Sequence, residues 1–187
     1  MCIRDSPICF YLSPIALLVI LGYSYTKRFT FLCHFVLGLG LALAPVGAYL
    51  AVLGVFDWIP ILYGLVVLFW VSGFDIIYAM QDEEFDKSLQ LYSVPTQLGK
   101  TKALQLSTFL HLICAVLILL AAWLTDQDLM AISWIHWLGV AIFIALLYYQ
   151  HTLVKPNDLS KVNLAFFTTN GMASLIFGTL FIIDLFV

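Results

Sequence analysis

The sequence predicts an all-α, polytopic transmembrane helix bundle, and three observations support this fold class. Of the 187 residues, 63% are hydrophobic and only 10% are charged, whereas soluble domains average about 25% charged residues. No segment alternates polar and apolar residues over ten positions, as the strands of a membrane barrel do. Six apolar stretches are long enough for the roughly 20-residue helix that crosses a bilayer. They lie near residues 8–26, 31–54, 58–80, 103–124, 131–152 and 164–187.

The basic residues predict how these stretches are oriented. Every lysine and arginine except Arg4 follows the first, third or fifth stretch, and so lies on one side of the predicted membrane. The ends on the other side carry aspartates and no basic residue. The positive-inside rule makes the basic side cytoplasmic. The basic residues are Lys27, Arg28, Lys87, Lys100, Lys102, Lys155 and Lys161.

Three aspartates stand at the end of the third stretch, on the cytoplasmic side. The spacings of seven and four residues between Asp75, Asp82 and Asp86 predict one helix face, with the carboxylates within about 20° of each other. Such a face suits Mg²⁺, which is usually held by one or two carboxylates together with substrate phosphates. Because Asp75 lies inside an apolar span, it indicates function; the alternative is a plain acidic loop. Glu83 and Glu84 point to other faces and are expected to be solvated.

A second candidate group follows the first stretch, on the same side of the membrane. Tyr23 and Lys27 are four residues apart and share a helix face. Lys27 and Arg28 could hold phosphate oxygens near a bound magnesium ion, the arginine in a bidentate way. The alternative is an ordinary positive anchor with an interfacial tyrosine.

The remaining polar residues of the spans give weaker signals. Asn170 in the last stretch is a candidate substrate-binding residue, whose amide faces a cavity or hydrogen-bonds a neighbouring helix. We expect His34, His111 and His136, which are isolated on apolar spans, to be packing residues. Residues 81–102 form the longest loop and carry Ser93-Val-Pro95, which predicts an ordered turn or short helix before the fourth span. Without a basic patch, nucleic-acid binding has no support.

At these residues the chain resembles a known family. The run Gly-Phe-Asp-Ile-Ile-Tyr-Ala-Met-Gln-Asp-Glu-Glu-Phe-Asp (residues 73–86) resembles the second aspartate-rich motif of the UbiA superfamily of intramembrane prenyltransferases. Ser93-Val-Pro95 and Leu98-Gly99 continue the match. The run from Leu21 to Thr30 resembles the family's tyrosine–lysine motif. The two motifs occur in the right order and on one predicted side, and the resemblance extends from about residue 8 to the C-terminus.

The resemblance implies a fold, a cofactor and a reaction. The family has nine transmembrane helices around a lateral cavity, where two aspartate-rich motifs bind Mg²⁺ and the diphosphate of an isoprenoid donor. By this resemblance Asp75, Asp82 and Asp86 are metal-binding and catalytic residues. Tyr23, Lys27 and Arg28 contact the diphosphate or orient the aromatic acceptor. These seven residues, with Asn170, are the expected site.

Within the family, the residues most resemble enzymes of ubiquinone biosynthesis. These enzymes transfer a polyprenyl group from polyprenyl diphosphate to the ring carbon ortho to the hydroxyl of 4-hydroxybenzoate. The membrane lipid is then the medium from which the long donor tail enters. The expected location is a bacterial inner membrane, with the site facing the cytoplasm.

The chain also departs from the family pattern. The first aspartate-rich motif would precede residue 8 and is absent, and the six stretches correspond to the last six of nine helices. We therefore expect residues 1–7 to be a foreign or artefactual start. Residues 8–187 are then the C-terminal two-thirds of a prenyltransferase membrane domain, and this chain alone should be inactive.

Two other classes compete with this interpretation. A membrane transporter or ion-coupled carrier could use Asp75 as an intramembrane cation site, but such proteins often carry internal repeats, and none is seen. Phosphatidyltransferases also use magnesium and membrane aspartates, but their longer motif, with fixed glycines and an arginine, is not present.

Overall fold

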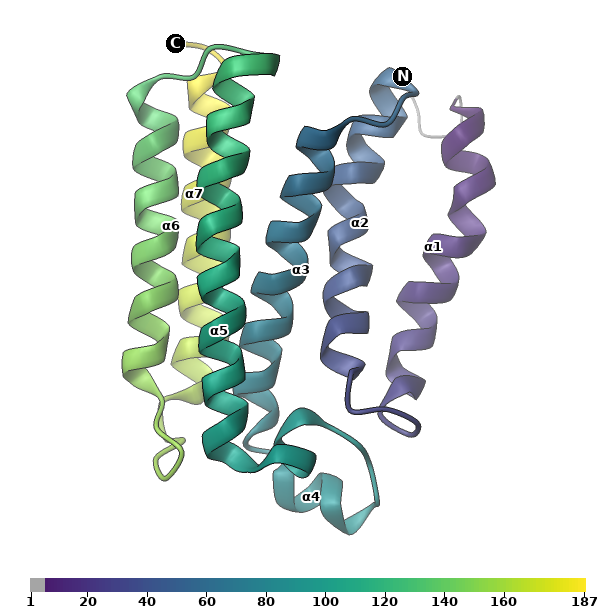
Figure 1. The fold of residues 1–187 in the computed structure, drawn as a ribbon, viewed down its shortest axis with the longest axis vertical. Helices are drawn as coiled ribbons and strands as arrows, with labels where there is room; N and C mark the ends of the chain where they lie inside the picture. The colour runs from purple at the N-terminus through teal and green to yellow at the C-terminus, as the bar shows by residue number, and fades with distance from the viewer. Residues whose placement is uncertain (1–5) are drawn as a thin grey trace.

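A computed structural model describes residues 6–187, and Figure 1 shows its helices. Residues 1–5, most of the expected foreign start, lie outside the described residues. A π-helical segment, Thr125–Leu129, extends α5, and a second, Leu164–Thr169, leads into α7. The helices are α1 (Pro7–Thr26), α2 (Cys33–Leu53), α3 (Trp58–Ala79), α4 (Glu83–Ser88), α5 (Val94–Leu124), α6 (Trp134–Leu153) and α7 (Asn170–Asp184).

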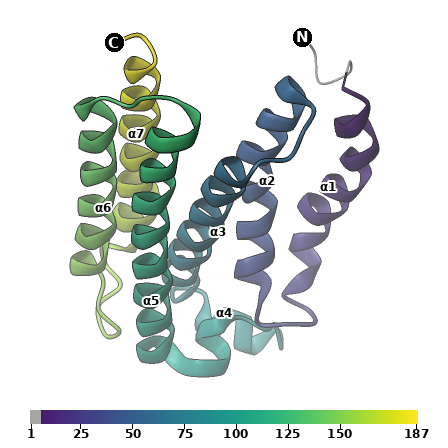
Figure 2. The same cartoon turned by 45° about the horizontal axis from the view of Figure 1, so that its top comes forward.

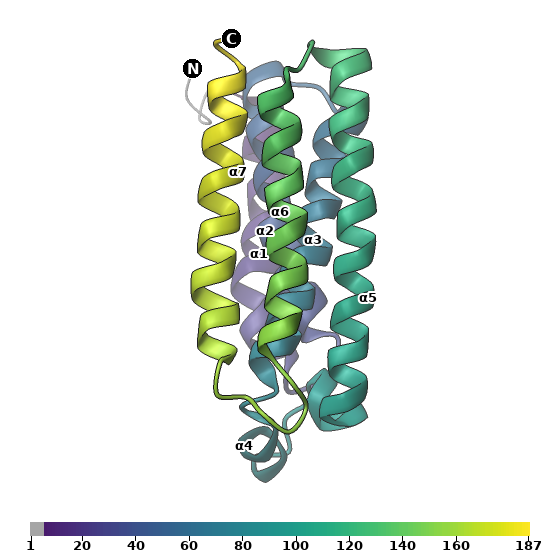
Figure 3. The ribbon, with the colours of Figure 1, turned by 90° about the vertical axis from the view of Figure 1, so that its left-hand side faces the viewer.

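The long helices run up and down, and α3 lies between two groups of them. It packs against α2 on one side and α5 on the other, while α1 packs on α2 and α6 packs on α7. Figures 1 and 2 show this order, and Figure 3 shows α5, α6 and α7 side by side from the end of the molecule. The described N-terminal and C-terminal residues lie at one end of the bundle, and the short α4 lies at the other (Figure 1).

The all-α membrane bundle predicted from the sequence is confirmed. By length and composition, α1, α2 and α3 could each cross a membrane, as could Val94–Leu129 and Leu164–Asp184. The predicted fifth span coincides with α6, which has 20 residues but is not among these five candidates. Its tryptophans, histidines, tyrosines and glutamine make it less apolar than the other long helices.

The fourth predicted span begins earlier than residue 103, because the loop before it is helical. Ser93 caps α5: its hydroxyl accepts from the backbone N–H of Thr96, and the Thr96 side chain accepts from the N–H of Ser93. This reciprocal capping box satisfies two N–H groups that the first helical turn leaves free. Gly99 then interrupts the helix with φ 76° and ψ 162°, a conformation that favours glycine. The expected short helix before the fourth span is therefore the first turn of α5.

Small residues let α3 approach both of its neighbours closely. A Cβ atom on Gly38 of α2 would lie 2.6 Å from the carbonyl oxygen of Leu68, and one on Gly73 would lie 2.3 Å from the ring of His111. Ser107 of α5 donates to the carbonyl of Gly73 at 2.7 Å. Close backbone contact and interhelical hydrogen bonds are what hold helices together where lipid supplies no hydrophobic drive.

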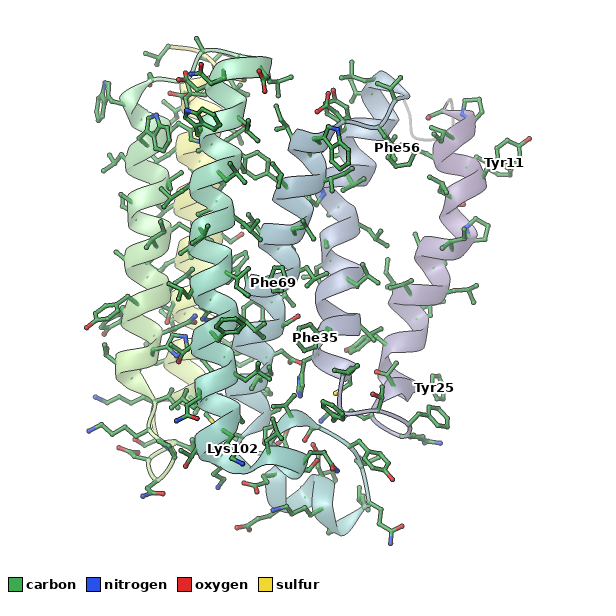
Figure 4. All side chains as sticks on the ribbon, viewed as in Figure 1. Tyr11, Tyr25, Phe35, Phe56, Phe69 and Lys102 are labelled. Atoms are coloured by element: carbon green, nitrogen blue, oxygen red, sulfur yellow. The ribbon has the colours of Figure 1, made fainter. Side chains whose placement is uncertain are left out.

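The charged side chains gather at the end of the bundle where α4 lies. Figure 4 shows them around α4, the lower end of α5 and the nearby helix connections, with Lys102 and Tyr25 labelled there and Tyr11 and Phe56 at the opposite end. Above this polar end, Phe35 of α2 and Phe69 of α3 pack against a buried apolar cluster that includes Ile76. The bundle thus has a closed apolar interior directly above its polar end.

Candidate functional site

The three aspartates do not share one helix face, contrary to the sequence prediction. Helix α3 ends at Ala79 and Met80 caps it, whereas Asp82 occupies the position before the first residue of α4. The acidic residues themselves favour this break, since negative side chains are stabilised in the first turn of a new helix. The chain therefore turns between Asp75 and Asp82, and α4 lies across the end of the bundle (Figure 1).

Asp75 remains on α3 and is held by a histidine of α2. Its Oδ2 atom lies 2.6 Å from Nδ1 of His34. The imidazole is 1% exposed, whereas the carboxylate side chain is 22% exposed. His34 thus stands behind Asp75, and the carboxylate faces open space.

Asp86 lies on α4 and is paired with Lys27. The Lys27 ammonium donates to both carboxylate oxygens, at 3.3 and 3.0 Å, and the Asp86 side chain is only 3% exposed. Burial disfavours the charged ammonium, but the hydrogen bond and the charge of Asp86 outweigh it and raise the pKa of Lys27 above its ordinary value. The negative charge of Asp82 adds to this increase. The pair joins the α1–α2 connection to α4.

The two groups that the sequence singled out meet around one pocket. A cavity of about 260 Å³ is lined by Tyr23, Ser24, Lys27, Cys33 and Asp75. It combines an ammonium group, a carboxylate and two hydroxyl groups in a small space. The ends of α1, α2 and α3 supply these residues.

Tyr23 also borders an apolar pocket that continues along the membrane direction. This second cavity, of about 340 Å³, lies between α1 and α2 and includes Val19, Val36 and Gly40. A polar pocket beside an apolar one suits a molecule with a charged head and a hydrocarbon tail. A larger apolar pocket of about 540 Å³, lined by residues such as Tyr63 and Trp70, contains none of the predicted site residues.

Arg28 and Asn170 lie apart from the polar pocket. Arg28 lines a neighbouring cavity of about 530 Å³, together with Ser24, Lys27 and the segment 89–91. Its guanidinium lies 5.7 Å from the ring centroid of Tyr25. The Asn170 amide accepts from the indole of Trp70 at 3.1 Å and donates to the carbonyl of Phe166 at 2.9 Å. Asn170 therefore bonds a neighbouring helix, which is one of its two predicted alternatives.

Glu83 corrects another expectation. It was predicted to be solvated, but it is 9% exposed, because Lys87 lies 2.6 Å and Lys100 lies 3.9 Å from its carboxylate oxygens. Two lysines that the loop brings together thus draw it inward. Glu84 is exposed, as expected.

The donors suit a hard cation only in part. Within residues 6–187, no group of three histidine, cysteine or acidic side chains is arranged to hold a metal ion. Asp75 keeps one oxygen free of His34, and Asp82 is partly exposed, whereas Lys27 occupies both oxygens of Asp86. Two available carboxylates match the usual protein share of a magnesium site, in which substrate phosphates supply further ligands.

His34 is the residue at this site that sequence reasoning missed. It was expected to be a packing residue, as were His111 and His136, which are 3% and 1% exposed. Consecutive membrane helices are antiparallel, so the start of one and the end of the next lie on the same side of the membrane. Applied to the second and third stretches, that rule places His34 and Asp75 at the same depth.

Comparison with known proteins identifies the family. Residues 3–172 match the model of the UbiA prenyltransferase family. The chain belongs to this family. The match covers both sequence motifs and every helix that lines the polar pocket.

Relatives of the UbiA family agree with this assignment. The chain is 26% identical over 171 residues to a 4-hydroxybenzoate octaprenyltransferase from Psychromonas ingrahamii, covering 91% of this chain and 58% of the relative. It is 31% identical over 169 residues to one from Polynucleobacter asymbioticus, covering 89% and 56%. The chain thus spans somewhat more than half the length of these relatives.

A solved UbiA structure shows the same fold. The ligand-free structure of a UbiA homologue from Aeropyrum pernix K1 superimposes with a TM-score of 0.81 at 29% sequence identity, covering 96% of this chain and 65% of the other. Family membership favours the enzyme over the ion-coupled carrier that the sequence left open.

Proposed function

We propose that this chain supplies one part of a magnesium-dependent prenyltransferase site. The reaction is the transfer of a polyprenyl group from polyprenyl diphosphate to 4-hydroxybenzoate, at the ring carbon ortho to the hydroxyl, as in ubiquinone biosynthesis. The observation that carries the proposal is the pocket in which Tyr23, Lys27 and Asp75 converge. The relatives' names support the donor and the acceptor, and the family supports the metal.

Asp75 and Asp82 are the residues that fit a magnesium site in this structure. Bound Mg²⁺ neutralises diphosphate oxygens and so makes the diphosphate a better leaving group. Asp86 would join the metal ligands only if Lys27 moved away from it. This assignment keeps all three aspartates at the site and gives Asp86 a further role in holding Lys27.

Lys27 and Arg28 provide the positive charge for the diphosphate. The Lys27 ammonium has three N–H groups, and it lines both the polar pocket and the cavity of Arg28. A diphosphate that spans the two cavities would contact both cations. Fixed charges of this kind stabilise the negative charge that develops on the leaving group.

The apolar cavity beside Tyr23 suits the donor's tail. Its lining of valine, isoleucine and leucine side chains offers no hydrogen bonds to water, and so protects an allylic cation from hydrolysis. The Tyr23 ring stands between the polar and apolar cavities, where it can stabilise that cation through its π face. The electron-rich ring of the acceptor then attacks the cation, and the ring proton is lost.

The proposed location is a bacterial inner membrane with the polar pocket facing the cytoplasm. The basic residues at the α4 end support this orientation. Diphosphate substrates and free magnesium would then reach the pocket from the cytoplasm, and the lipid tail from the bilayer. That these 187 residues are inactive by themselves also stays a prediction.

The test is prenyl transfer by the full-length protein in membranes, with labelled 4-hydroxybenzoate and a polyprenyl diphosphate. We expect activity with Mg²⁺, loss of activity with EDTA, and a loss of at least 100-fold in Asp75→Asn. Glu84→Gln is the matched control, because this exposed carboxylate lies near the same turn. Full activity in Asp75→Asn, or in EDTA, would contradict the proposal.

A further inference from the structure

His34 is placed to control how Asp75 presents its carboxylate. It lies at the start of α2, next to Cys33, which lines the polar pocket. His34 itself is absent from that lining and is 1% exposed. The imidazole therefore contacts Asp75 from the buried side, where no substrate reaches it.

The second nitrogen of His34 fixes the position of the proton on the ring. The backbone N–H of Val94 donates to Nε2 of His34 at 3.3 Å, so Nε2 is an acceptor without a hydrogen. In a neutral imidazole the proton must then be on Nδ1, which donates to Oδ2 of Asp75 at 2.6 Å. Val94 is the first residue of α5 and is held there by the Ser93 capping box.

This arrangement leaves one oxygen of Asp75 for the pocket. Oδ2 is occupied by the imidazole, and in the described part of the chain no hydrogen bond reaches Oδ1. A donor on Nδ1 also favours the ionised carboxylate, since an ion accepts a stronger hydrogen bond than a neutral acid. The geometry thus orients a charged, one-sided ligand toward Lys27 and Tyr23.

We infer that His34 is a positioning residue, which links Val94 to Asp75 and holds the Asp75 carboxylate in the orientation that binds the cation and diphosphate. It touches no substrate and acts only through Asp75. The inference deepens the proposed function and rests on it. It assigns a role to a buried histidine that the two sequence motifs do not include.

Two substitutions separate this role from simple packing. His34→Gln keeps an N–H donor for Asp75 and a carbonyl acceptor for Val94, whereas His34→Leu fills similar space with neither. In the full-length protein we expect His34→Leu to raise the Mg²⁺ concentration for half-maximal prenyl transfer at least tenfold, with a smaller change in kcat. His34→Gln should stay within about threefold of the wild type in both quantities.

A second readout needs no turnover. We expect Mg²⁺ with inorganic diphosphate to raise the Tm of the wild type and of His34→Gln, and to leave the Tm of His34→Leu unchanged. His136→Leu is the matched control, because His136 is also buried beside an aspartate, 4.0 Å from Asp184, but at the opposite end of the bundle. It should lower the Tm and leave both magnesium responses as in the wild type.

The outcomes distinguish the two levels of the proposal. A folded His34→Leu with a wild-type magnesium response, or a His34→Gln as impaired as His34→Leu, would overturn the positioning role. If His34→Leu does not fold, His34→Asn takes its place, since its shorter side chain cannot reach both partners. Absence of prenyl transfer in the wild type would refute the proposed function instead, and the Tm comparison would still test His34.

Discussion

Lys27 and Asp86 are 59 residues apart in the sequence, and their side chains form a bidentate ion pair at 3.3 and 3.0 Å. The backbone N–H of Tyr92 also donates to the carbonyl of Lys27, at 2.7 Å. The α1–α2 connection is therefore fastened to both ends of the α4 segment. Lys27 serves the structure as well as the proposed diphosphate site.

Removal of Lys27 should destabilise the folded protein. In Lys27→Met the buried Asp86 carboxylate loses its donor, and we expect the free energy of unfolding to fall by about 2 kcal/mol, the cost of leaving a buried polar group without its partner. Thermal unfolding in detergent measures the change. Lys87→Met is the control: Lys87 is 55% exposed and pairs within one helix, so the loss should be about 0.3 kcal/mol. Equal losses in the two variants would refute the structural role of Lys27.

The raised pKa of Lys27 predicts a dependence of stability on alkaline pH. The pKa is higher in the folded than in the unfolded protein, so the folded state holds the proton more tightly. The stabilisation is complete below the unfolded pKa of about 10.4 and is lost as the pH rises through the folded pKa. Melting curves between pH 8 and 12 should therefore show a steeper decline for the wild type than for Lys27→Met. Lys27→Arg, which stays protonated, should keep its stability at high pH; a decline as steep as that of the wild type would assign the effect to another group.

Asp82 and Asp86 should differ in stability but not in their effect on activity. We expect both Asp82→Ala and Asp86→Ala to abolish magnesium-dependent prenyl transfer and to leave membrane insertion intact. Only Asp86→Ala should also lower the Tm, because it leaves the ammonium of Lys27 without its main partner. Activity assays and melting curves on the same preparations check both expectations. Normal turnover in either variant would remove that residue from the list of metal ligands.

Gly73 should tolerate no side chain, since α3 and α5 touch at this position. In Gly73→Ala the new methyl group would lie 2.3 Å from the His111 ring, and the ring would lose its 3.1 Å contact with the Trp70 carbonyl. We expect a loss of about 2 kcal/mol from this overpacking. Gly47→Ala meets nothing within 4 Å, so this control should be neutral or stabilising by less than about 1 kcal/mol. A Gly73→Ala variant as stable as the control would show that α5 can move aside.

Much of the fold was predictable because membrane helices announce themselves by length and apolar content. The meeting of Tyr23, Lys27 and Asp75 was also within reach, since the first and third stretches end on the side where the basic residues lie. Neither inference needs packing detail. Both depend on patterns that the bilayer imposes on the sequence.

The remainder of the site depends on contacts between distant segments. The spacing of Asp75, Asp82 and Asp86 fits a continuous helix as well as the observed break after Ala79, so spacing could not decide between them. The burial of Glu83 follows from lysines on either side of a turn. The role of His34 depends on a backbone N–H at the start of α5, which no side-chain pattern reveals.

The contact between His34 and Val94 has a consequence for biosynthesis. Synthesis proceeds at about 5–20 residues per second, so several seconds pass between the appearance of His34 and that of Val94, 60 residues later. During that time the first three spans insert with the histidine and its aspartate lacking their backbone partner. The polar pocket is therefore completed late, when the fourth span enters the bilayer, and a chain that stalls before this point leaves its ionisable groups exposed at the translocon.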